Sequence, residues 1–269
     1  LLYVSPVWTP TRFDEEGLKE VLSKFFGTLS NVYNFFVLYA NTDQVDPRDF
    51  FVDYDKRPEI DKWILSKYNN LVKEVNAELA IFDLNRSVRK IQYFVNEDLS
   101  NWYIRRNRRR FWASELDDDK KAVYNTTYEV LEGLSRLIAP FASYISEEIY
   151  QKLTDKLSVH LADYPVADES LINEKIEERM DLVRDLVSLG RAAREKEQIK
   201  VRQPIQKILV DGKYEELISD LIPLIKEELN LKEVVFEKDL SKFMDYTLKP
   251  NFKFAGPILG SKIKSLGKA

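Results

Sequence analysis

The sequence of 269 residues contains no cysteine and a single histidine, His160. Without cysteine, neither a disulfide nor a zinc–thiolate site can form. A histidine-based metal site or a Ser-His-Asp triad would depend on His160 alone, and we interpret this residue as an ordinary loop or core histidine. The absence of cysteine also fits a reducing compartment. We therefore expect no metal site and predict a cytoplasmic location.

Long apolar runs are missing as well. None approaches the ~20 residues that a membrane-spanning helix needs, and the opening Leu1–Val4 segment lacks the basic flank of a signal peptide. Apolar residues nevertheless make up 44% of the chain and aromatic residues 12%, a composition that can form a packed core. We expect a globular chain without membrane contact. Because the sequence opens at Leu1 and not at methionine, we interpret it as part of a longer protein.

Motifs of enzymatic sites are also absent. The sequence has no GxxxxGK[ST] phosphate loop, no GxGxxG after a strand, no HExxH and no CxxC. Carboxylates are numerous, but they fall on expected helix surfaces beside cations, and no isolated pair suits acid/base work. We therefore predict no catalytic residue in this chain, and a stand-alone enzyme is disfavoured.

Glycine is rare, with 8 residues, and long segments follow helical periodicity. In the first, apolar residues spaced alternately by four and three form one stripe, with Asp14 as a candidate N-cap. The stripe comprises Leu18, Leu22, Phe25, Leu29, Val32, Phe36 and Tyr39. Pro140 should kink or divide the fourth helical segment. The expected helices run from about Glu15 to Asn41, Pro58 to Phe82, Leu84 to Phe111, Asp117 to Ile149 and Asn173 to Glu197.

The pattern changes after residue 199. Ile205 to Val210 and Glu233 to Glu237 are typical of strands, with a helix from about Glu215 to Leu229 between them. This order predicts a small α+β or βαβ unit. Before it, residues 154–171 are expected as a loop with an extended piece at Leu157–Val159. We predict a mainly α protein, with an antiparallel helical bundle in residues 1–172 and, in 173–269, a connecting helix, a small α+β module and a basic tail.

A dense basic cluster lies in the third predicted helix. The net charge of the chain is −4, which by itself disfavours a nucleic-acid binder. Locally, however, five arginines fall within six positions, and they are flanked by aromatic and amide side chains. The candidate RNA-binding residues of this segment are Asn101, Trp102, Arg105, Arg106, Arg108, Arg109, Arg110 and Trp112.

Two interpretations of this cluster stay open. Cations favour the C-terminal end of a helix, and the acidic run Glu115–Asp119 lies near, so the arginines could be structural. Alternatively, guanidinium groups bind phosphates and aromatic rings stack on unpaired bases. At a period of 3.6, Trp102, Arg105, Arg106 and Arg109 share a face, so the arginines cannot all meet the same ligand.

The end of the first predicted helix is a second candidate surface. Amide and ring groups there can read base edges, and they belong to Asn31, Asn34, Tyr39 and Asn41. These positions also flank the apolar stripe, so an ordinary polar helix face is the alternative.

Several segments together resemble the isoleucyl-tRNA synthetase family, which belongs to the class I aminoacyl-tRNA synthetases. The resemblance covers essentially the whole chain in order, and its pattern is similar to the eukaryote-like subgroup that also occurs in some bacteria. The most distinctive segment is Asn101–Arg106 followed by Arg109–Trp112. The others are Ser5–Phe13, Asn31–Asn41, Arg57–Ser66, Ile199–Ile205 and Leu248–Phe252.

The resemblance implies a function that composition does not reveal. The chain would be the C-terminal anticodon-binding region, which holds and discriminates the anticodon stem-loop of tRNA(Ile). Its partners would be that tRNA and the catalytic domain of the same polypeptide, which joins isoleucine to tRNA with ATP and Mg²⁺. The HIGH-like and KMSKS-like signatures of that domain are absent here, so the fragment alone should be catalytically inactive and hold no cofactor.

Two alternatives remain beside this interpretation. Valyl-, leucyl- and methionyl-tRNA synthetases share such bundles, so the amino acid could differ. A helical interaction scaffold without an RNA role is the second, because apolar stripes can also pack against a partner helix.

Overall fold

The computed structural model describes Pro10 and residues 15–243. The motif at Ser5–Phe13, the candidate N-cap Asp14 and the basic tail from Leu248 therefore lie outside the described residues, apart from Pro10. The chain divides into two compact units, Leu1–Met180 and Asp181–Ala269. The division falls within one continuous helix, α8 (Glu174–Lys196).

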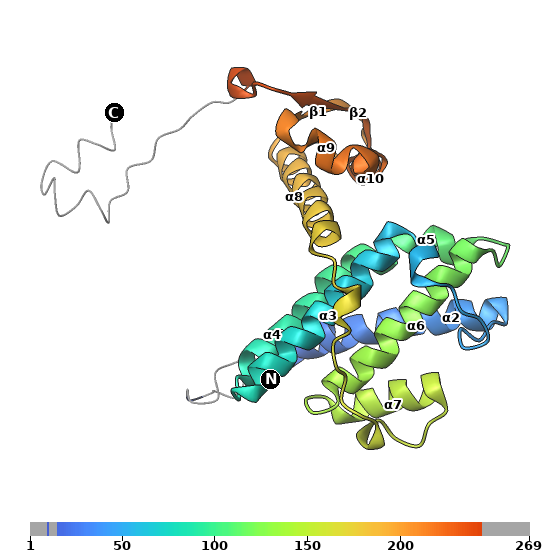
Figure 1. Cartoon of the computed structure of the whole chain (residues 1–269). Coiled ribbons are helices and arrows are strands. Elements are labelled where there is room, and N and C mark those ends of the chain that lie inside the picture. The colour runs from blue at the N-terminus through green and yellow to red at the C-terminus, as the bar shows by residue number, and fades with distance from the viewer. Residues whose placement is uncertain (1–9, 11–14, 244–269) are drawn as a thin grey trace, which may run out of the picture. The chain divides into compact units, whose positions relative to one another are not determined.

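The first unit is a bundle of long helices (Figure 1). Its first helical segment runs from residue 15 to residue 43 without a break, as α1 (Glu15–Val21), a π-helical stretch (Leu22–Phe26) and α2 (Gly27–Asp43). Helix α3 (Glu59–Ala80) follows a loop that contains a 3₁₀ turn at Tyr54–Lys56. These bounds confirm the first two predicted helices to within a few residues.

The third predicted helix is likewise continuous. It comprises α4 (Leu84–Tyr93), a π-helical stretch (Phe94–Ile104) and α5 (Arg105–Trp112). The Asp83 side chain caps its start by accepting a hydrogen bond from the Arg86 backbone N–H at 3.0 Å. Such a cap satisfies one of the amide donors that the first helical turn leaves free.

Proline divides the fourth predicted segment, as expected. Helix α6 (Asp118–Ile138) begins at Asp117, which accepts from the Lys120 N–H, and ends before Pro140. Helix α7 (Ser143–Thr154) then continues the chain. A proline has no N–H and its ring meets the preceding turn, so one helix could not run through this position.

The bundle core forms where α2, α3, α6 and the π-helical stretch before α5 pack together. Val32, Trp63, Leu99 and Leu134 are each at most 2% exposed. The first two positions of the stripe predicted for the first helical segment differ, since Leu18 of α1 is 38% exposed and Leu22 of the π-helical stretch is 53% exposed. Periodicity shows which residues share a helix face, but not whether another element covers that face.

The loop after α7 departs from the predicted extended piece. Ser158 is extended, but Val159–Leu161 forms a 3₁₀ turn, and a second one follows at Glu169–Leu171. The Glu147 carboxylate holds the start of the first turn by accepting from the Ser158 hydroxyl at 3.1 Å and the Val159 N–H at 2.7 Å.

The second unit is a βαβ arrangement. Strands β1 (Ile205–Asp211) and β2 (Leu231–Glu237) pair in parallel, with Ile208 opposite Val234. Between them lie 3₁₀ turns at Gly212–Tyr214 and Ser219–Leu221 and the short helices α9 (Glu215–Ile218) and α10 (Ile222–Leu229). The single predicted helix is broken because Pro223 cannot donate the hydrogen bond that would continue it. A 3₁₀ turn at Ser241–Phe243 follows β2.

A buried arginine holds the second unit together. Arg194 is 3% exposed and donates to the carbonyls of Lys200 and Gln203 at 2.9 Å each and of Leu229 at 2.6 Å. Gly190 touches Leu229 so closely that a Cβ at this position would collide with that side chain. The helical bundle and the two-stranded parallel sheet confirm the predicted mainly α class with a small α+β part.

Candidate nucleic-acid interface

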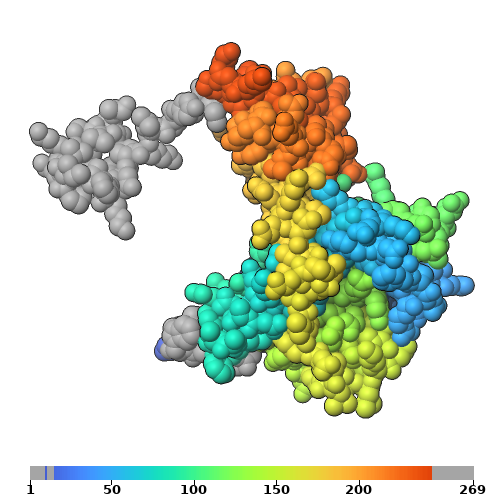
Figure 2. Space-filling model, in the orientation of Figure 1, coloured from blue at the N-terminus to red at the C-terminus, as the bar shows by residue number. Residues whose placement is uncertain are grey.

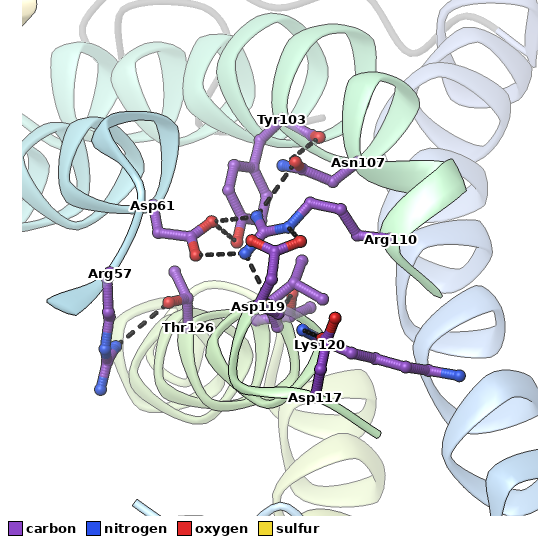
Figure 3. A network of polar contacts seen from close by, with 11 residues as sticks. Arg57, Asp61, Tyr103, Asn107, Arg110, Asp117, Asp119, Lys120 and Thr126 are labelled. Atoms are coloured by element: carbon purple, nitrogen blue, oxygen red, sulfur yellow. Dashed lines mark hydrogen bonds and ion pairs between the residues drawn. The ribbon is translucent and has the colours of Figure 1, made fainter. Parts of the chain in front are cut away.

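The inner face of α5 is fixed by a buried ion pair. Arg110 donates through two nitrogens to the two oxygens of Asp61, at 2.7 and 2.8 Å, and Asp61 on α3 is fully buried. Arg110 also donates to the Asp119 carboxylate on α6 at 2.9 Å. Figure 3 shows the guanidinium between the two carboxylates. One side chain therefore joins α3, α5 and α6.

Tyr103 completes this cluster. Its hydroxyl donates to Asp61 at 2.8 Å (Figure 3). Burial, and then the charge of Asp61, raise the pKa of Tyr103 well above its usual value, so the phenol stays protonated. Burial opposes the charge of Arg110, but its hydrogen bond and attraction to Asp61 outweigh this and raise its pKa. Arg110 therefore stays charged around neutral pH.

An aromatic cluster joins α2, α5 and α6. The Phe111 ring lies edge-on to Phe35 and to Tyr124, with centroids 5.1 Å apart in both cases, and 6.4 Å from Tyr39. Such edge-to-face pairs add to the stability gained by burying the rings. The C-terminal parts of α2 and α5 are thus packed side by side. Of the predicted candidates, Tyr39 takes part in this packing and is only half-exposed.

The outer face of α5 presents the arginines to solvent. Arg105, Arg108 and Trp112 follow spacings of three and four, so they form one stripe on α5, and Asn101 in the π-helical stretch lies beside Arg105. Asn101 and Arg108 are exposed, Arg105 is half-buried, and Trp112 is 56% exposed. Arg105 donates to the Asn101 carbonyl at 2.8 Å. Among the described residues, none forms a hydrogen bond or ion pair with the Arg108 side chain. We call these four residues the outer stripe.

The remaining candidates of this segment differ in their exposure. Trp102 is 5% exposed, and its indole N–H points to the Met180 sulfur at 3.3 Å. Arg106 lies over the Trp102 ring, 5.9 Å from its centroid, and is half-buried, while Arg109 is exposed. Trp102 and Arg110 therefore point into the protein. A ligand at the outer stripe would meet Arg105, Arg108 and Arg109 first.

The outer face of α2 carries the asparagines. Asn31, Asn34 and Asn41 are exposed, as is Leu38 at 58%. They lie opposite the buried positions Val32, Phe36 and Ala40. The last turn of α2 lies near the end of α5 because the Lys120 ammonium of α6 contacts both Asp43, at 2.6 Å, and the Ala113 carbonyl, at 2.5 Å. In Figure 2, the segment that follows α2 (blue) and the loop between α5 and α6 (green) adjoin at the surface.

Sequence reasoning missed the polar groups that hold this region together. Lys120 is 2% exposed and Asp61 is fully buried, whereas these residue types usually face solvent. No local pattern marks them, because their partners lie 77 and 49 positions away in the chain, at Asp43 and Arg110. Only the acidic run Glu115–Asp119 gave a signal, as a possible structural partner of the arginines, and Asp119 does pair with Arg110.

The interface lies largely inside a recognised family segment. Residues 61–209, more than half of the chain, match the family described as the anticodon-binding domain of tRNA ligase. The chain belongs to this family. The matched segment of the anticodon-binding domain includes α5, Asp61 and Lys120, while α2 precedes it.

Similarity to curated relatives extends over almost the whole chain. The isoleucine–tRNA ligase of Clostridium novyi is 44% identical over 98% of this chain, and that of Porphyromonas gingivalis 40% over 98%. Isoleucine–tRNA ligase 2 of Bacillus anthracis is 40% identical over 99%. The chain spans about a quarter of their length, namely 26%, 24% and 26%. The predicted resemblance to this synthetase family is thereby confirmed.

None of the described helices has an apolar stretch long enough to span a membrane.

Proposed function

We propose that this chain holds the anticodon stem-loop of tRNA(Ile) as the anticodon-binding part of an isoleucine–tRNA ligase. Two kinds of support converge. The family match gives the domain type, and the relatives similar over nearly the whole chain are named isoleucine–tRNA ligases. The outer stripe of α5 carries the physical argument, because it presents cations beside an exposed indole within reach of the α2 end.

The chemistry of the outer stripe suits a nucleic-acid loop. Arg105 and Arg108 can each hold a phosphate through two parallel hydrogen bonds. Trp112 offers a ring face on which an unpaired base can stack. The amides of Asn34 and Asn41 can donate to and accept from base edges. Phosphate contacts would position the loop and the amides would distinguish its bases.

The remaining steps of the reaction belong to the whole enzyme. We propose that a catalytic domain of the same polypeptide joins isoleucine to the tRNA, using ATP with Mg²⁺ bound there, and that the enzyme works in the cytoplasm. In this scheme the chain contributes binding energy and orientation, and no catalytic residue. Placing the tRNA acceptor end for reaction then depends on how firmly the anticodon loop is held.

Binding to tRNAs that differ only in their anticodon tests the proposal. We expect the chain to bind a tRNA(Ile) transcript more tightly than the same transcript carrying a valine or methionine anticodon. A wrong base typically costs a site of this kind about 1–3 kcal/mol, or roughly 5- to 150-fold in affinity, by analogy with DNA sites. Equal affinity for all anticodons, or preference for another one, would contradict the assignment.

A further inference from the structure

Lys120 is a charged residue in a place where charge is rare. It lies in the first turn of α6 and is 2% exposed. Its ammonium contacts Asp43 Oδ2 at 2.6 Å and donates to the Ala113 carbonyl at 2.5 Å. Asp43 is the last residue of α2, and Ala113 directly follows α5. One buried amine therefore binds the ends of both helices.

We call this contact between the ends of α2 and α5 the joint, and Tyr124 adds to it. Its hydroxyl donates to Asp43 Oδ2 at 2.5 Å. Its ring lies edge-on to Phe111 of α5 at 5.1 Å and to Phe36 of α2 at 6.1 Å. The joint thus has a polar part at the helix ends and an aromatic part below it, and both parts connect the same three helices.

The chemistry of the joint indicates that it fixes the geometry of the helix ends more than it stabilises the fold. Burying an ammonium and a carboxylate costs solvation energy that their attraction only partly offsets, so apolar residues often serve stability equally well. An ion pair with defined donors, however, fixes distance and direction more narrowly than an apolar contact does. What Lys120 adds is a fixed spacing between the ends of α2 and α5.

These two ends carry candidate RNA-binding residues. Asn41 lies two positions before Asp43, and Trp112 is the residue before Ala113. We infer that Lys120 is a positioning residue for RNA binding, which sets the spacing between these two segments so that one RNA loop touches both at once. This inference rests on the proposed function. Binding to two surfaces that are already held at the right spacing costs less conformational entropy than binding that must first order them.

The test measures whether the two segments act together. The dissociation constant for the tRNA(Ile) anticodon stem-loop is determined for the 269-residue chain, its Lys120→Met variant and its Lys121→Met variant. Lys121→Met is the matched control, because it removes the same charge at the neighbouring position. Lys121 forms only a long ion pair with exposed Asp118, at 3.9 Å. We expect Lys120→Met to weaken binding about tenfold and Lys121→Met less than twofold.

Trp112→Ala in each background separates positioning from simple loss of stability. In the parent and in Lys121→Met, removing the indole should weaken binding about tenfold, the scale of one lost stack. In Lys120→Met the same change should cost less than threefold, because Trp112 is no longer held at the right spacing. Circular dichroism at the assay temperature verifies that each variant is folded.

A second route avoids dependence on one substitution. If Lys120→Met does not fold, Asp43→Asn replaces it, since the amide oxygen still accepts hydrogen bonds while the ion pair is lost. An equal cost of Trp112→Ala in all folded backgrounds would overturn the inference. Absence of RNA binding by the parent chain would instead refute the proposed function, so the two failures are distinguishable.

Discussion

The two faces of α5 use the same residue type for opposite purposes. On the inner face, Arg110 is held by Asp61 and Asp119 and joins three helices. On the outer face, Arg108 is exposed, two positions away in the same helix. The comparison shows that local sequence density of arginine does not define a ligand surface. Partners from other helices, such as Asp61 of α3, decide which arginines stay exposed.

The largest expected effect comes from breaking the inner face. Arg110→Met should lower the free energy of unfolding by about 3–5 kcal/mol, because Asp61 would stay buried without its cation. Urea denaturation followed by circular dichroism measures this loss. The double variant Arg110→Met/Asp61→Leu should recover much of the stability, since it removes both charges. No recovery would show that Arg110 acts through something other than this pair.

Substitutions on the outer face of α5 should weaken RNA binding and leave the fold intact. The double variant Arg105→Glu/Arg108→Glu should weaken binding of the anticodon stem-loop about 10- to 100-fold, since two phosphate contacts become repulsive. Its unfolding free energy should change by about 1 kcal/mol or less, as is usual for surface sites. Lys175→Glu, at an exposed position of α8, is the control for charge. Large loss of stability with unchanged binding would reverse our assignment of the two faces.

The exposed indole of the outer stripe should have a smaller effect. Trp112→Ala should reduce RNA affinity by about 1–3 kcal/mol, the range for one base stacked on an aromatic ring. Tyr144 provides the comparison, since its side chain is 93% exposed on α7, and Tyr144→Ala should leave affinity unchanged. Fluorescence titration with labelled stem-loop measures both. Equal effects of the two changes would remove Trp112 from the interface.

The smallest expected effect is on stability at alkaline pH, which should depend on the buried Tyr103 beside Asp61. Burial and the Asp61 charge raise the pKa of Tyr103, so above pH ~10 the unfolded chain releases this proton while the folded chain keeps it. Stability is therefore complete below pH ~10 and falls above it, by about 1.4 kcal/mol per pH unit for one tyrosine. Tyr103→Phe should make this decline shallower in denaturation curves recorded from pH 9 to 11. Parallel declines would contradict the predicted shift.

Sequence patterns predicted the elements well where the cause is local. Asp117 and Pro140 set the start and the end of α6 through a cap and a missing N–H, and both residues lie within two positions of the helix ends they control. The strand-like segment Ile205–Val210, which runs into the turn residues Asp211 and Gly212, likewise predicted β1. These causes act over a few residues, so they are visible without knowledge of the fold.

The candidate site was predictable only in outline. The basic segment was found from its density, but Arg110 and Trp102 could not be separated from Arg108, because Asp61 and Met180 are distant in sequence. The buried role of Lys120 was invisible for the same reason. The π-helical stretch Phe94–Ile104 also shifts the helix phase just before the arginines, which periodicity at 3.6 does not anticipate.

The central claim is that the outer stripe of α5 neutralises phosphates. The salt dependence of RNA binding tests this claim most directly. The logarithm of the association constant for the tRNA(Ile) anticodon stem-loop should fall linearly with the logarithm of salt concentration. In Arg105→Glu/Arg108→Glu the slope should be shallower by about 1.4, or about 0.7 per lost phosphate contact. An identical slope in the parent and the variant would contradict the account.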